Sequence, residues 1–61
     1  MLTKPNRIIY SPDGIIIDCL RDDPGGLSFP APGMLGAEFD DSAQLDVFIT
    51  EQKLVRPLQI S

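Results

Sequence analysis

The chain has 61 residues, a formal net charge of −4, no histidine, and one cysteine, Cys19. These counts exclude most familiar catalytic and zinc sites. Histidine is the usual proton carrier and metal ligand near neutral pH, and a lone cysteine has neither an imidazole base nor further thiolates beside it. A chain this short forms one small domain and buries only about 60% of the surface that its unfolded form exposes. We therefore expect a marginally stable binding protein with no catalytic residues, no metal and no cofactor.

A β-hairpin is predicted over about residues 7–20. Two β-rich runs flank SPDG at 11–14, where proline and glycine hold the second and fourth positions of a type I turn. In the second run, Asp18 marks the solvated face of the strand. Strand alternation then places three side chains on the inner face: Ile15, Ile17 and Cys19. We expect Cys19 to be a buried and unreactive thiol.

The next stretch, 21–39, is predicted to be a long connection rich in proline and glycine. Within it, LSFPAPGML at 27–35 carries large apolar side chains on a backbone that its prolines hold extended, near polyproline II. Such a segment suits docking into a groove on a partner. The candidate anchors are three: Phe29, Met34 and Leu35. Alternatively, the segment folds back over the sheet and completes the core. The two roles can also share the segment, with Phe29 partly in the core and Met34 and Leu35 outside.

A short helix is predicted over about 42–52, with Asp41 as its cap and an apolar stripe from Leu45 onward. A strand is the alternative, because apolar residues also alternate over 45–49 and VFIT is β-rich. The last segment, about 54–60, is expected to be an edge strand, since its proline cannot donate to a central ladder. The element order predicts an α+β domain, with one helix packed on about three antiparallel strands.

The acidic side chains are concentrated in the middle of the chain. Between residues 8 and 52, nine acids stand against one base, Arg21, so that this stretch has a net charge of −8. No basic patch could follow a phosphate backbone, which argues against direct nucleic-acid binding. An alternative function is that of a small acidic inhibitor, which imitates nucleic acid and binds the basic surface of an enzyme. Its candidate contacts are Asp22, Asp23, Asp40, Asp41 and Asp46.

Apolar runs such as III at 15–17 are far too short for a membrane span, which needs about 20 residues, and no signal-peptide pattern is present. We therefore expect an intracellular, cytoplasmic protein, or one incorporated in a virion or another assembly. A small chain without disulfide or metal often gains stability by association. The sequence favours a non-enzymatic accessory or structural subunit, of a kind frequent in bacteriophages, that contacts a protein partner or a second copy of itself.

Overall fold

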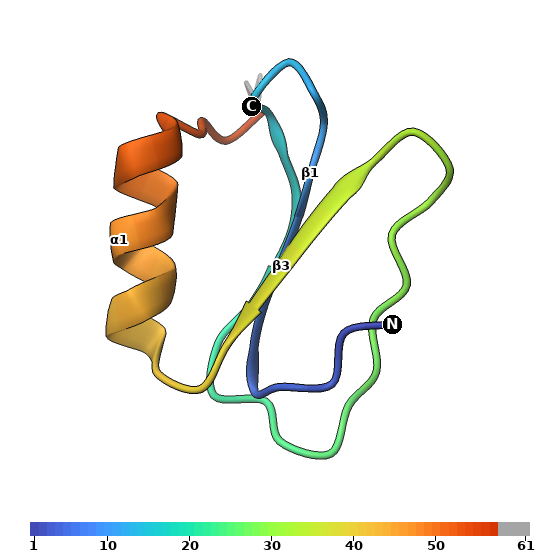
Figure 1. Cartoon of the computed structure of the whole chain (residues 1–61), viewed down its shortest axis with the longest axis vertical. Coiled ribbons are helices and arrows are strands. Elements are labelled where there is room, and N and C mark those ends of the chain that lie inside the picture. The colour runs from blue at the N-terminus through green and yellow to red at the C-terminus, as the bar shows by residue number, and fades with distance from the viewer. Residues whose placement is uncertain (58–61) are drawn as a thin grey trace, which may run out of the picture.

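The computed structural model describes residues 1–57 and shows a three-stranded antiparallel sheet with one helix packed on it (Figure 1). The strands lie in the order β2-β1-β3, so that the first strand in the chain is the central one. Their bounds, with that of the helix, are β1 Asn6–Tyr10, β2 Ile16–Leu20, β3 Leu35–Phe39 and α1 Ser42–Gln52. The predicted α+β class of a single small domain is confirmed.

The predicted hairpin of β1 and β2 is present, and its turn is closed by backbone and side-chain hydrogen bonds. The Gly14 N–H donates to the Ser11 carbonyl at 2.9 Å, and the Ile15 N–H donates to the Ser11 hydroxyl at 3.2 Å. Gly14 has a φ of +87°, in the left-handed region that favours glycine. This is the pattern of a type I turn followed by a residue with positive φ, a common hairpin connection.

Replacing Gly14 by valine should therefore destabilise the domain by about 1 kcal/mol or more. A side-chain atom at this position would meet nothing within 4 Å, so the cost comes from the backbone conformation and not from a clash. Urea denaturation should show the loss, and Gly14→Asn should lose less, because asparagine tolerates positive φ. Equal stability of the valine variant and the wild type would contradict the turn assignment.

The pairing of β1 with β2 contains a β-bulge. Ile9 pairs with Asp18, whereas the next residue, Tyr10, pairs with Ile16, so Ile17 has no partner of its own. An extra residue in one strand shifts its side-chain alternation by one position.

The bulge corrects part of the predicted alternation of β2. Ile16 is the buried residue, while Ile15 and Ile17 are exposed. Cys19 lies on the core side of the strand as predicted and packs against the core, but it is half-buried rather than fully buried.

The stretch predicted as a single connection, 21–39, includes a third strand. β3 pairs antiparallel with β1 along its whole length, from Asn6 opposite Phe39 to Tyr10 opposite Leu35. The extended segment predicted before it is interrupted by a turn, because the Met34 N–H donates to the carbonyl of Ala31 at 2.9 Å. Proline and glycine at the two central positions of this turn, with positive φ at the glycine, are typical of a type II turn.

The helix α1 begins and ends where the sequence predicts, and its cap is the predicted one. The Asp41 side chain accepts a hydrogen bond from the Ala43 N–H at 3.1 Å, which satisfies one of the free donors of the first turn. Beyond Gln52, Lys53 takes a left-handed conformation and ends the helix. Leu45 is the buried residue of α1.

The core lies between α1 and one face of the sheet. Phe48 of the helix meets two rings of the sheet, Tyr10 at 5.7 Å and Phe39 at 5.3 Å between centroids. The buried members of this core come from both strands of the hairpin, from the helix and from the segment after it: Ile8, Ile16, Leu45 and Leu54.

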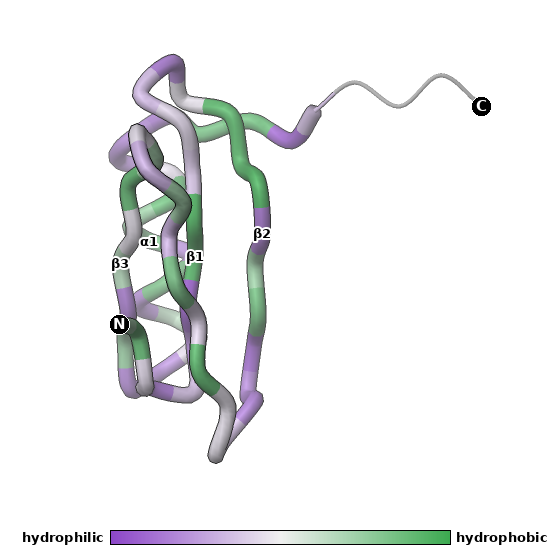
Figure 2. The backbone as a smooth tube through the Cα atoms, turned by 90° about the vertical axis from the view of Figure 1, so that its right-hand side faces the viewer, coloured by the Kyte–Doolittle hydropathy of each residue, from purple (hydrophilic) through white to green (hydrophobic). Residues whose placement is uncertain are grey.

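The opposite face of the sheet is covered by irregular chain. The first residues and the connection between β2 and β3 cross this face, so that the sheet lies between them and α1 (Figures 1 and 2). Leu2 and Ser28 form an antiparallel bridge within this outer layer. A side-chain atom at Gly36 of β3 would lie 2.8 Å from Pro30 and 3.1 Å from Leu2, so the absence of a side chain there permits the close packing.

The predicted edge strand at 54–60 is reduced to one bridge within the described chain. Val55 forms a parallel bridge with Ile15, and Arg56 and Pro57 follow without strand pairing. The remainder of that prediction, 58–60, lies outside the described residues.

Candidate functional site

A buried arginine organises the outer layer. The side chain of Arg7, on the outer face of β1, is 1% exposed. Its Nε donates to the Ser28 hydroxyl at 2.9 Å, its Nη1 donates to the carbonyls of Lys4 and Asp23 at 2.8 and 3.0 Å, and its Nη2 donates to the Asp23 carboxylate at 2.6 Å. A buried guanidinium is tolerated only when its donors are satisfied in this way. Arg7 therefore ties the first residues and the connection to the sheet.

Backbone hydrogen bonds fix the same layer. Leu2 and Ser28 exchange two of them, at 2.8 and 3.0 Å, and the Asp23 N–H donates to the Pro5 carbonyl at 2.9 Å. The Asp22 N–H donates to the Asn6 side-chain oxygen at 3.0 Å. The connection is therefore anchored at its start and near its middle, which limits the conformations open to the residues between.

Two large apolar side chains project from this anchored segment. Leu27 is 58% exposed and Phe29 is 66% exposed, while Ser28 between them is buried. In extended chain, neighbouring side chains point to opposite sides. Because the Ser28 hydroxyl faces inward to Arg7, its two neighbours face solvent. The expectation that Phe29 lies partly in the core is wrong, and Leu27, which the sequence analysis did not select as an anchor, is its neighbour on the surface.

The other two predicted anchors do not join this pair. Leu35 is exposed and lies opposite Tyr10, whose ring packs on the helix side of the sheet. Residues directly opposite one another in antiparallel strands share a face, so Leu35 belongs to the face opposite the one that carries the outer layer. Met34, at the turn before β3, is half-buried.

In four of the five candidate acids the side chain has a contact within the chain. Asp23 binds Arg7, Asp41 caps α1, Asp46 forms an ion pair with Arg21, and Asp40 lies 3.5 Å from the Lys4 ammonium. Asp22 is exposed and has a positive φ of 50°. These acids have separate structural roles in different elements.

Glu38 of β3 is a further acid with an internal contact. Its carboxylate accepts hydrogen bonds from the backbone N–H groups of Thr3 and Lys4, at 2.7 and 3.2 Å. These two donors stabilise the charged form and lower the pKa of Glu38 below its ordinary value. The first residues of the chain are therefore held to β3 as well as to the connection.

Within residues 1–57, no three side chains of the metal-binding types come together, and no helix there is both long and apolar enough to cross a membrane. No protein-family model matches the chain, and neither a curated protein nor a solved structure shows significant similarity to it. The Leu27–Phe29 pair combines a fixed backbone with the two most exposed of the large apolar side chains after Met1, and it is our candidate site.

Proposed function

We propose that this protein is a non-enzymatic accessory or structural subunit that acts by contact with another protein, with Leu27 and Phe29 as the anchors. The observation that supports the proposal is the contrast within three consecutive residues. Ser28 is buried and bound to Arg7, whereas the two apolar side chains beside it are more than half exposed.

The energetics of association favour such an arrangement. Binding costs free energy for every flexible side chain and loop that becomes ordered at the interface. Leu27 and Phe29 extend from backbone that is already held by Arg7 and by the bridge to Leu2. Most of the free energy from burying these two side chains is then available for affinity, and a well-packed anchor of this kind often contributes about 2 kcal/mol or more.

The alternative function, an acidic inhibitor that imitates nucleic acid, has less support. It requires carboxylates that are free to meet a basic surface, whereas Asp23, Asp41 and Asp46 already bind groups of their own chain. Asp22 and Asp40 are exposed, and neither caps the helix nor binds an arginine. We retain them as the test positions for this alternative.

Changing both anchors to serine, Leu27→Ser with Phe29→Ser, should reduce the affinity for the partner about a thousandfold, since each anchor contributes about 2 kcal/mol. The measurement is quantitative affinity purification of the tagged full chain from its native host. Both side chains are exposed, so circular dichroism and the melting temperature should change little.

The matched control is Val47→Ser with Val55→Ser, which removes two equally exposed apolar side chains elsewhere. This control should capture the partner as the wild type does. Equal capture by the Leu27/Phe29 variant would contradict the proposal. Loss of capture on Asp22→Asn with Asp40→Asn, and not on the serine changes, would instead support the acidic inhibitor.

A further inference from the structure

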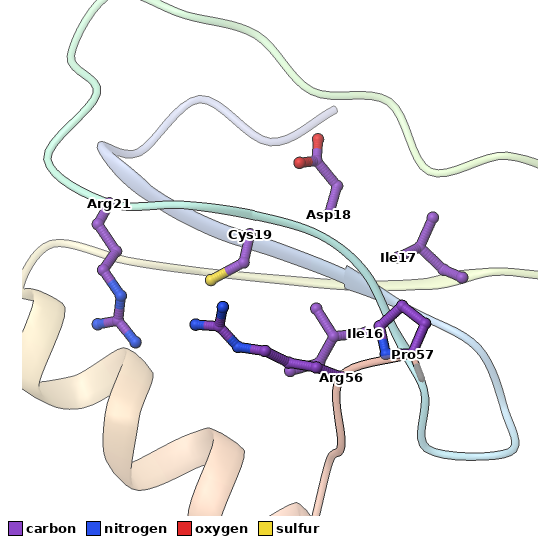
Figure 3. A pocket seen from close by; sticks show the side chains of 7 residues that line it. All are labelled: Ile16, Ile17, Asp18, Cys19, Arg21, Arg56 and Pro57. Carbon is purple, nitrogen blue, oxygen red and sulfur yellow. The ribbon is translucent and has the colours of Figure 1, made fainter. Parts of the chain in front are cut away.

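A second feature of the surface lies at the opposite edge of the sheet from β3. A hollow of about 590 Å³ follows the outer edge of β2 (Figure 3). Four consecutive strand residues, 16–19, line it together with Arg21, and it is bounded at one end by Arg56 and Pro57. A cavity lined by a run of consecutive strand residues has the shape of a missing neighbouring strand.

The edge of β2 is paired only at its beginning. The Ile16 N–H donates to the Val55 carbonyl at 2.8 Å, and the Val55 N–H donates to the Gly14 carbonyl at 2.9 Å. Pro57 follows and has no N–H to donate. Among residues 1–57, no strand pairs with the rest of this edge, and alternate residues of an edge strand direct their N–H and C=O groups outward.

Two arginines, Arg21 and Arg56, line the hollow of this acidic protein together with one acid, Asp18. The two guanidinium groups come from different segments. That of Arg56 points toward the Cys19 sulfur and that of Arg21 toward α1, whereas the Asp18 side chain points to the other side of the strand (Figure 3). Asp46 binds Arg21 and fixes its position. Among the described residues, no carboxylate forms an ion pair with Arg56.

We propose that this edge binds an extended acidic segment of another protein as an additional β-strand. Main-chain hydrogen bonds to β2 would provide affinity, and carboxylates on alternate residues would meet Arg56 and Arg21. A second copy of this chain is a poorer occupant, because its β2 edge would bring a second Arg56 guanidinium into the same groove. The site is separate from the Leu27–Phe29 pair and does not depend on it.

The test uses the full chain and a blocked hexapeptide of alternating threonine and glutamate. In an NMR titration, amide shifts should appear at residues 17–21 and at Arg56, and the peptide should slow alkylation of Cys19. Arg56→Gln should weaken binding about tenfold, the effect expected when one charge-assisted hydrogen bond is lost. Lys53→Gln, which removes the same charge from an exposed position outside the hollow, should leave the affinity unchanged.

Two further peptides separate the contributions of charge and backbone. With glutamine in place of glutamate the affinity should fall, and with lysine it should fall further. Three results would overturn the proposal. One is equal affinity of the three peptides, and another is the absence of amide shifts at about 1 mM glutamate peptide, a concentration at which even weak binding is visible. The third is that the amide shifts are confined to residues 27–29. Leu27→Ser with Phe29→Ser should not alter the titration, so failure here and failure of the proposed function are distinguishable.

Discussion

Replacing Arg7 by methionine should destabilise the domain by about 2–4 kcal/mol, because the hydrogen bonds of a buried guanidinium are lost while its half-exposed partner Asp23 can be solvated. Methionine fills much of the same volume but donates no hydrogen bond. The carbonyls of Lys4 and Asp23 and the hydroxyl of Ser28 would lose their donor, and an unsatisfied buried group costs about 1–3 kcal/mol. The total free energy of unfolding of a chain of this size is only about 3–9 kcal/mol. Urea denaturation should therefore show a variant that is close to unfolded.

The matched control is Arg56→Met, the same substitution at an exposed arginine, which should change the free energy of unfolding by less than about 0.5 kcal/mol. Arg7→Lys should be intermediate, because a single ammonium cannot reach all the acceptors that the planar guanidinium reaches. If Arg7→Met stays within about 1 kcal/mol of the wild type, Arg7 does not hold the outer layer, and the proposed rigidity of residues 27–29 loses its basis.

Leu45→Ala should cost about 2–5 kcal/mol, the range for deleting a fully buried leucine side chain. Leu45 has no exposed surface and is the buried residue of α1, so it connects the helix to Ile8 and Ile16 of the sheet. Little else can fill the cavity in a core this small. Thermal unfolding followed by circular dichroism should show the largest loss of helix stability here.

Val47→Ala, also on α1 but mostly exposed, is the control and should stay within about 0.5 kcal/mol of the wild type. If the two substitutions lower the free energy of unfolding by similar amounts, Leu45 does not pack in a core between α1 and the sheet. Together with the Arg7 variants, this pair also separates the two layers, because Leu45 supports the helix side of the sheet and Arg7 supports the other side.

The hairpin and the helix could be predicted from sequence because local signals determine them. The SPDG turn brings two β-rich runs together, and Asp41 supplies the helix cap without help from distant residues. The third strand could not be predicted in the same way. Its residues include Gly36 and Ala37, which have low strand propensity, and it forms because β1 offers a free edge.

The candidate site was harder to predict because its geometry depends on distant contacts. Charged residues are rarely buried, and nothing near Arg7 in the sequence indicates that its acceptors come from Lys4, Asp23 and Ser28. The burial of Ser28 in turn decides that Phe29 faces solvent. The bulge at Ile17 is likewise invisible to an alternation rule that assumes regular pairing. The sequence therefore predicts a candidate segment at 27–35 but not which of its side chains are exposed.

The central claim is that Arg7 and the Leu2–Ser28 bridge hold the connection rigid so that Leu27 and Phe29 are presented to solvent. Amide hydrogen exchange of the wild-type chain tests it most directly. Each of Leu2 and Ser28 donates its N–H to the other's carbonyl, and we expect both amides to exchange only slightly faster than those of β1. Exchange of both amides at the rate of an unstructured peptide, with β1 still protected, would show that the segment is mobile and would contradict the account.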